Sequence, residues 1–163
     1  RGGNTYTCQR SYLPFDLSGE SGTIDTVSLS VYMDNLGSTG LPANVIAIEA
    51  TALAGSADDF GNVYSSGTTF GTTISSNLEV STTAGYHTFT VQPAGITAIQ
   101  KEIGSGTITI AIIGDAYDKL GVAPPLDGSY SQIKIDYANG SNDAYLTITY
   151  EVADNATFFG ANF

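Results

Sequence analysis

The sequence of 163 residues contains no tryptophan, one cysteine, one histidine and five basic residues. A single cysteine, Cys8, cannot form an internal disulfide, which excludes a small disulfide-stapled scaffold. Sixteen acidic residues against five Lys and Arg give a net charge of −11, which disfavours nucleic acid as a partner because phosphate binding needs a basic face. No stretch approaches the roughly 20 apolar residues of a membrane-spanning helix, so we expect no membrane insertion.

The composition predicts an ordered β-protein. Hydrophobic residues make up 42% of the chain and charged residues only 13%, with 19 glycines. The chain alternates apolar and polar residues in short segments, which is typical of half-buried strands. We therefore predict strands near residues 10–17, 23–34, 44–53, 72–74, 78–81, 85–91, 108–113, 131–137 and 144–152.

The alternation also predicts which side chains are buried. On the second strand one face carries the apolar residues Val27, Leu29, Val31 and Met33. The other face carries Tyr32 with serine and threonine. On the third strand, Ile46 and Ile48 are predicted to face the core, and on the strand at 85–91 His87 shares a face with Phe89 and Val91.

One segment has helical character. Pro93 is suited to the first turn of a helix, isoleucines follow at spacings of three and four residues, and Gly104 can end it. Many strands, regular turns and one short helix predict an all-β fold, an antiparallel β-sandwich of the jelly-roll type. We assign residues 1–152 to this single domain and 153–163 to a C-terminal aromatic tail.

The order of these segments resembles a known family. RSYLPFDLS at residues 10–18 is followed by TIDTVSLSVYM at 23–33, an AGYHTFTV strand that leads into the helix, TITIAIIG, and a closing AYLTITY. This series is similar to the jelly-roll domains called DNRLRE, which are related to carbohydrate-binding modules. The resemblance covers roughly residues 10–152 and implies an accessory domain of a bacterial surface protein, a polysaccharide-degrading enzyme or a phage virion protein.

Catalysis is not expected. His87 lies in the middle of a predicted strand and the sequence has no G-x-S-x-G turn, so a nucleophile with a histidine base is not indicated. We therefore predict a protein that is not an enzyme and needs no cofactor. The alternative to a protein without a cofactor is one that binds a structural calcium ion. The candidate oxygen ligands lie in predicted loops and are Asp115, Asp118, Asp58 and Asp59.

Tyrosines are the candidate ligand-binding residues, since aromatic faces can bind sugars and loops commonly carry binding sites. Tyr64, Tyr117 and Tyr130 lie in predicted loops and form the candidate glycan site. The other tyrosines considered are expected to pack with their hydroxyls at the rim of the sandwich; they are Tyr12, Tyr32, Tyr86, Tyr137, Tyr145 and Tyr150.

The chain ends in TFFGANF, which places Phe158, Phe159 and Phe163 after the last predicted strand. Exposed aromatic surface marks interaction sites, so we predict that these three residues contact other subunits of an assembly. The first residues, Arg1 to Asn4, suggest that the sequence is a C-terminal portion of a longer chain. The expected location is a virion or the extracellular surface.

Two functions follow as expectations. The first is a non-catalytic structural or adhesion domain, most simply a phage virion component such as a capsid decoration or a tail-fibre domain, or a surface-assembly protein. The alternative is a carbohydrate-binding module of a secreted polysaccharide-active enzyme.

Overall fold

The computed structural model describes most of the two sheets and the helix. The described residues are 10–39, 43–50, 64–65, 68–69, 71–81, 83–120, 130–136 and 142–152.

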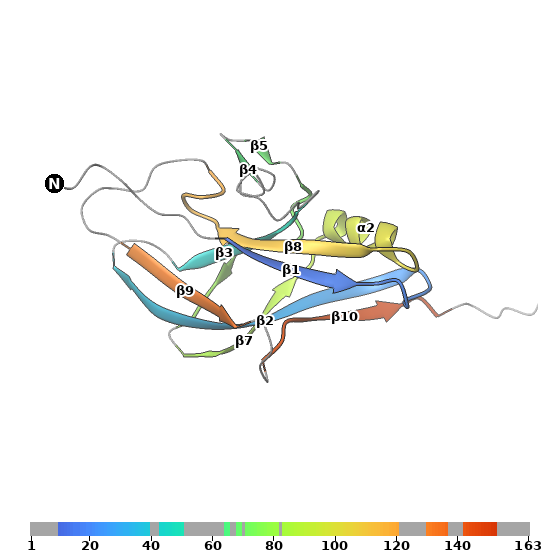
Figure 1. Ribbon diagram of the computed structural model, residues 1–163, viewed down its shortest axis with the longest axis horizontal. Helices are drawn as coiled ribbons and strands as arrows, with labels where there is room; N and C mark the ends of the chain where they lie inside the picture. Colours follow the sequence, from blue (N-terminus) through green and yellow to red (C-terminus); the bar gives the residue numbers. More distant parts are fainter. Residues whose placement is uncertain are drawn as a thin grey trace, which may run out of the picture.

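The fold is an antiparallel β-sandwich with one helix, as predicted (Figure 1). Sheet A has the order β1 (Ser11–Asp16), β8 (Thr107–Gly114), β3 (Asn44–Glu49), β6 (Leu78–Glu79). Sheet B has the order β10 (Tyr145–Tyr150), β2 (Ile24–Thr39), β7 (Gly85–Thr90), and β9 (Tyr130–Asp136) also pairs with β2. A separate two-stranded pair joins β4 (Tyr64–Ser65) to β5 (Thr68–Thr69).

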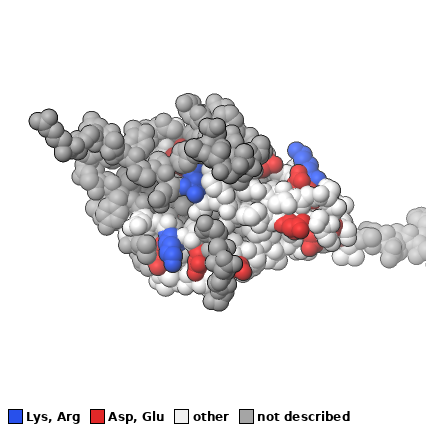
Figure 2. Space-filling model, viewed as in Figure 1, with Lys and Arg blue, Asp and Glu red and all other residues white. Residues whose placement is uncertain are grey.

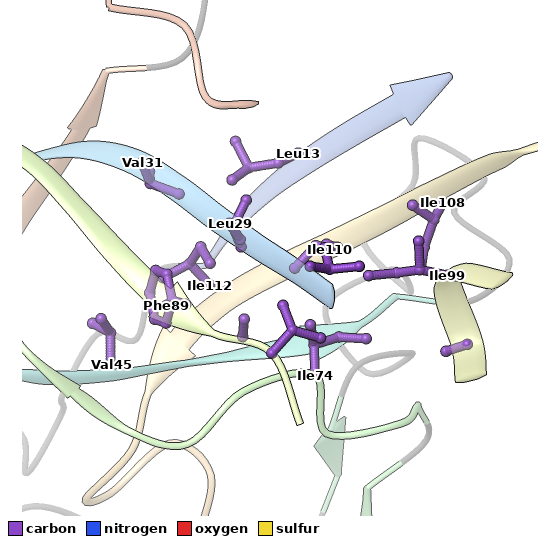
Figure 3. Packing of buried hydrophobic residues seen from close by; sticks show 14 of the residues in the cluster. Leu13, Leu29, Val31, Val45, Ile74, Phe89, Ile99, Ile108, Ile110 and Ile112 are labelled. Atoms are coloured by element: carbon purple, nitrogen blue, oxygen red, sulfur yellow. The ribbon is translucent and has the colours of Figure 1, made fainter. Parts of the chain in front are cut away.

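The main core lies between the two sheets (Figure 3). The predicted inward face of β2 is confirmed, because Leu29, Val31 and Met33 are fully buried. They pack in one cluster with Phe89 of β7 and Ile110 of β8. Burial of each such side chain contributes on the order of 1.5–3 kcal/mol, which makes this interlayer cluster the main source of stability.

The central strands β3 and β8 of sheet A are buried on both faces, which changes the expected role of two isoleucines. Ile46 and Ile48 are buried as predicted, but they form a second cluster with Ala50, Ala111 and Ile113, apart from the interlayer core. Their neighbours Val45 and Ala47 face the interlayer core instead. A strand that is covered on both faces has a continuous run of apolar residues in its sequence. The alternation of apolar and polar residues therefore could not identify which face of β3 packs against sheet B.

The edge of sheet A beside β3 is irregular. Thr73 bridges to Ile48, and Leu78 of β6 pairs with Val45, so both segments predicted near 72–74 and 78–81 lie along β3. Between them Ser75 is fully buried, and its Oγ accepts a hydrogen bond from the Ala47 amide at 3.1 Å. The hydroxyl satisfies a backbone donor where the strand ladder is interrupted.

Strands β9 and β10 lie end to end along one edge of β2. β9 pairs with residues 32–39 of β2 and β10 with residues 24–30, whereas β7 pairs with residues 28–33 and therefore occupies the other edge. Asp136 is opposite Tyr32 and Tyr145 is opposite Ser30, so β9 ends and β10 begins at β2 positions only two residues apart. We call the described residues 142–144, which precede β10, the β9–β10 insertion.

The helix α2 (Pro93–Glu102) closes one end of the sandwich beside β8 (Figure 1). Ala98 and Ile99 are buried in the interlayer core, and Gly95 is buried against Ile74. Gly104 follows the helix with φ +79° and donates to the Leu17 carbonyl at 2.9 Å, which confirms its predicted role in ending the helix. Within the described part of the chain, no helix is long and apolar enough to cross a membrane.

Candidate functional site

The outward face of sheet B carries alternating polar and aromatic side chains. β2 contributes Ser28, Ser30 and Tyr32, which point away from the core because their neighbours are buried in it. Directly opposite residues of antiparallel strands share a face, so the register fixes the neighbours of each β2 residue. Tyr32 lies between Tyr86 and Asp136.

Three tyrosines meet on this face, and we call Tyr32, Tyr86 and Tyr145 the tyrosine platform. The Tyr32 and Tyr86 rings are edge to face with centroids 5.5 Å apart, and the Tyr86 and Tyr145 rings are tilted with centroids 5.4 Å apart. Tyr86 belongs to β7 and Tyr145 to β10, on opposite sides of β2, so their rings must lean over the central strand. The small side chain of Ser30, opposite Tyr145, leaves room for this approach.

The platform is both a structural cluster and an exposed one. Tyr86 is 44% exposed and Tyr145 is 46% exposed, whereas Tyr32 is half-buried. Aromatic pairs in this geometry stabilise a sheet by roughly 0.5–1.5 kcal/mol beyond area burial. The stabilisation explains why the rings contact each other. Nearly half of each outer tyrosine nevertheless remains in solvent, where a ligand can reach it.

The β9–β10 insertion forms a polar rim beside the platform. The Tyr86 hydroxyl donates to the Asp143 backbone carbonyl at 3.2 Å, and Asn142 Nδ2 donates to Asp136 Oδ2 at 3.3 Å. Desolvation, the neighbouring Tyr145 and the charges of Asp143 and Asp136 raise the pKa of Tyr86 above its usual value. Tyr86 therefore stays a neutral hydrogen-bond donor throughout the physiological pH range.

Hydroxyl groups continue the face beyond the tyrosines. Ser30 lies opposite Thr88, and their hydroxyl oxygens are 3.0 Å apart. The next row places Ser28 between Thr90 and Thr147, both of which are exposed. The outward face of sheet B thus combines exposed aromatic rings, a rim with carboxylates, and rows of hydroxyl groups.

The tyrosine platform was not predicted from the sequence. Its members were expected to pack with only their hydroxyls at the rim, and the exposure of Tyr86 and Tyr145 shows that this expectation is wrong for the two outer rings. The alternation did place Tyr32 on the outward face. The missing information was the register of β7 and β10 against β2, which brings the three rings together.

The three loop tyrosines lie on separate elements. Tyr117 is half-buried in the turn after β8, Tyr64 begins β4 and Tyr130 begins β9. The side chains of Tyr64 and Tyr130 lie outside the described part of the structure. A joint glycan site built from these three residues therefore stays a prediction.

The candidate calcium ligands that the structure describes are paired with basic residues. Arg10 makes two hydrogen bonds to Asp118, from Nε at 2.9 Å and from Nη2 at 2.6 Å, and both side chains are largely buried. Burial lowers the pKa of the Arg10 guanidinium, but the hydrogen bonds and charge of Asp118 outweigh it and leave the pKa raised. Lys119 Nζ lies 3.2 Å from Asp115.

These ion pairs indicate a structural role for Asp115 and Asp118 in the described structure. Asp58 and Asp59 lie outside the described residues, as do Phe158, Phe159 and Phe163 of the tail. Among the described residues, no three His, Cys, Asp or Glu side chains gather closely enough to hold a metal ion. Calcium binding and tail contacts remain predictions.

His87 lies on the inward face of β7, as the alternation predicted. It is half-buried, pairs in register with Val31, and shares its face with the buried Phe89. This position is that of a side chain at the border of the core.

Comparison with known proteins adds no relative from which a function could be transferred. No protein-family model, curated protein or solved structure matches the chain. The resemblance to DNRLRE-type jelly-roll domains therefore remains a prediction from the sequence pattern.

Proposed function

We propose that this protein is a non-catalytic adhesion domain that binds a glycan on the outward face of sheet B. The observation that carries the proposal is the tyrosine platform, in which Tyr86 and Tyr145 are nearly half exposed although they contact each other. Exposed, immobilised aromatic rings supply large contact area at low entropic cost, because the rings are already held in place.

The hydroxyl rows extend the platform into a surface suited to a chain-like ligand. From Tyr32 to Thr26 the outward residues of β2 span roughly 20 Å, at about 3.3 Å per residue. Sugar rings offer an apolar face for stacking and hydroxyl groups for hydrogen bonding. A saccharide chain along β2 would therefore meet aromatic rings at one end and serine and threonine hydroxyls at the other.

Two biological settings are carried forward as proposals. The first is a virion or surface assembly, as a capsid decoration or tail-fibre domain, in which the glycan would be a receptor. The second is a carbohydrate-binding module of a secreted polysaccharide-active enzyme, in which the glycan would be the enzyme's substrate. The net charge of −11 helps to keep the protein soluble in either setting. Figure 2 shows acidic side chains outnumbering basic ones on one described face of the molecule.

A glycan panel with three matched alanine variants tests the proposal. We expect Tyr86→Ala and Tyr145→Ala to weaken binding at least tenfold, since truncated aromatic anchors commonly cost more than about 1.4 kcal/mol. Tyr117→Ala tests the competing loop site, because Tyr117 lies in the turn after β8 of sheet A. Thermal unfolding of each variant checks that the fold is retained.

Two outcomes would contradict the proposal. Flat titrations of the intact protein against the whole panel would exclude glycan binding. Binding that is lost in Tyr117→Ala and kept in both platform variants would place the site on the turn after β8 instead.

The assembly setting has a separate test. Light scattering on a sizing column compares the intact chain with a version that ends at Asn155. We expect oligomers of the intact chain and monomers of the shortened one if the tail phenylalanines hold subunits together, and equal monomer masses would contradict that role.

A further inference from the structure

The rim of the tyrosine platform is acidic, which restricts the charge of the ligand. Asp136 lies on the outward face directly opposite Tyr32, and Asp143 is exposed and adjoins Tyr86 through its backbone carbonyl. The next row of the face pairs Asp34 with Lys134. These described residues supply three carboxylates and one ammonium group, within a chain of net charge −11.

We propose that the glycan bound by the tyrosine platform carries protonated amino groups, as in a polymer of glucosamine. This inference rests on the proposed function and specifies its ligand class. The faces of the Tyr86 and Tyr145 rings attract cations through their negative electrostatic surface, and the carboxylates of Asp136 and Asp143 add charge attraction at the rim.

The position of the two carboxylates matches this role. Asn142 holds the Asp136 side chain through its amide, so that carboxylate is oriented before a ligand arrives. Asp143 is held close to the platform by the hydrogen bond from Tyr86 to its backbone, which leaves its side chain exposed. An ammonium group stacked on the outer rings would lie near Asp136 and Asp143, whose charges act on Tyr86.

The same arrangement disfavours two other glycan classes. A uronic acid or sulfated polymer would bring negative charge against the Asp136 and Asp143 rim and against the net charge of the chain. A neutral polymer would gain stacking but no charge attraction from the carboxylates. The hydroxyl rows of Ser28, Thr90 and Thr147 favour a sugar chain over a basic peptide, because they match hydroxyl groups spaced along the ligand.

The test uses two oligosaccharides of equal length, one with free amino groups and one in which an acetyl group on each nitrogen removes the charge. Oligomers of glucosamine and of N-acetylglucosamine are titrated at a pH where the free amine is protonated, at low and high salt. We expect at least tenfold tighter binding of the amine form at low salt, and a smaller preference at high salt because ions screen the interaction.

Matched variants test whether the preference for the charged oligomer comes from the carboxylates beside the platform. The double variant Asp136→Asn with Asp143→Asn removes both charges but keeps the side-chain shapes and the backbone acceptor of Tyr86. We expect it to lose the preference for the amine form. Glu79→Gln, an exposed position on β6 of the other sheet, is the control and should keep it.

Each result separates this inference from the proposed function. Equal affinity for the two oligomers would overturn the charge inference and leave glycan binding intact. Binding of neither form, nor of any other glycan, would overturn both. An oligolysine that competes as strongly as the glucosamine oligomer would show that the platform binds basic chains in general, and would overturn the assignment to an amino sugar.

Discussion

Replacing Gly95 by alanine separates helix propensity from tertiary packing. Gly95 lies in the first half of α2, where alanine is favoured over glycine by about 1 kcal/mol in an isolated helix. In the fold, however, an added Cβ would lie 2.5 Å from the Ile74 carbonyl oxygen and 2.9 Å from both Ile74 Cα and Val91 Cγ1. These distances are too short for non-bonded contact.

The neighbours of Gly95 cannot easily move. The Ile74 amide donates to the Ala47 carbonyl at 2.9 Å, and the Ile74 carbonyl accepts from the Gln92 amide at 2.8 Å, just before the helix begins. Overpacking of such a site costs about 1–3 kcal/mol. Subtracting the ~1 kcal/mol gained in helix propensity leaves a net destabilisation of up to about 2 kcal/mol.

Thermal and urea unfolding measure this effect. For a chain of this size each kcal/mol shifts the melting temperature by about 2–4 °C, so we expect Gly95→Ala to lower it by up to about 8 °C. Gly85→Ala is the matched control, because no heavy atom lies within 4 Å of a Cβ built there. A Gly95→Ala protein that is more stable than the native protein by about 1 kcal/mol, as helix propensity alone predicts, would refute the close approach of α2 to the edge of sheet A.

Two further predictions concern hydrogen bonds elsewhere in the sandwich. The Tyr150 hydroxyl donates to Glu20 Oε2 at 2.6 Å, and this hydrogen bond raises the pKa of Tyr150 from its usual 10.0 to about 12. Because the folded-state pKa is raised, the hydrogen bond stabilises the protein fully below pH 10, and this stabilisation is lost as the pH rises towards 12. The difference in unfolding free energy between the native protein and Tyr150→Phe should therefore shrink between pH 10 and 12. Urea titrations that show a constant difference across this range would contradict the prediction. Ser75→Ala removes the buried acceptor of the Ala47 amide and should lower the free energy of unfolding by about 1–3 kcal/mol, and an unchanged urea midpoint would show that this amide has another partner.

Much of the fold could be predicted from the sequence because its signals are local. Alternation on β2 identified Leu29, Val31 and Met33 as core residues, and Pro93 with Gly104 marked the ends of the helix. These signals succeed because strand geometry and backbone dihedral preferences act over a few neighbouring residues. These local signals could not predict the two-sided burial of β3 and β8, since Ile46 and Ile48 are apolar whichever face they occupy.

The candidate site depended on information that no local pattern contains. The sequence by itself determined that Tyr32 points outward, that the chain is acidic, and that the fold is a β-sandwich with little basic surface. Only the tertiary structure decided that β7 and β10 flank β2 in a register that joins Tyr32, Tyr86 and Tyr145, and that the β9–β10 insertion places Asp143 beside them. The physical reason is that strand register follows from pairing between segments more than fifty residues apart, where the shared burial of their inward faces selects one alignment over all others.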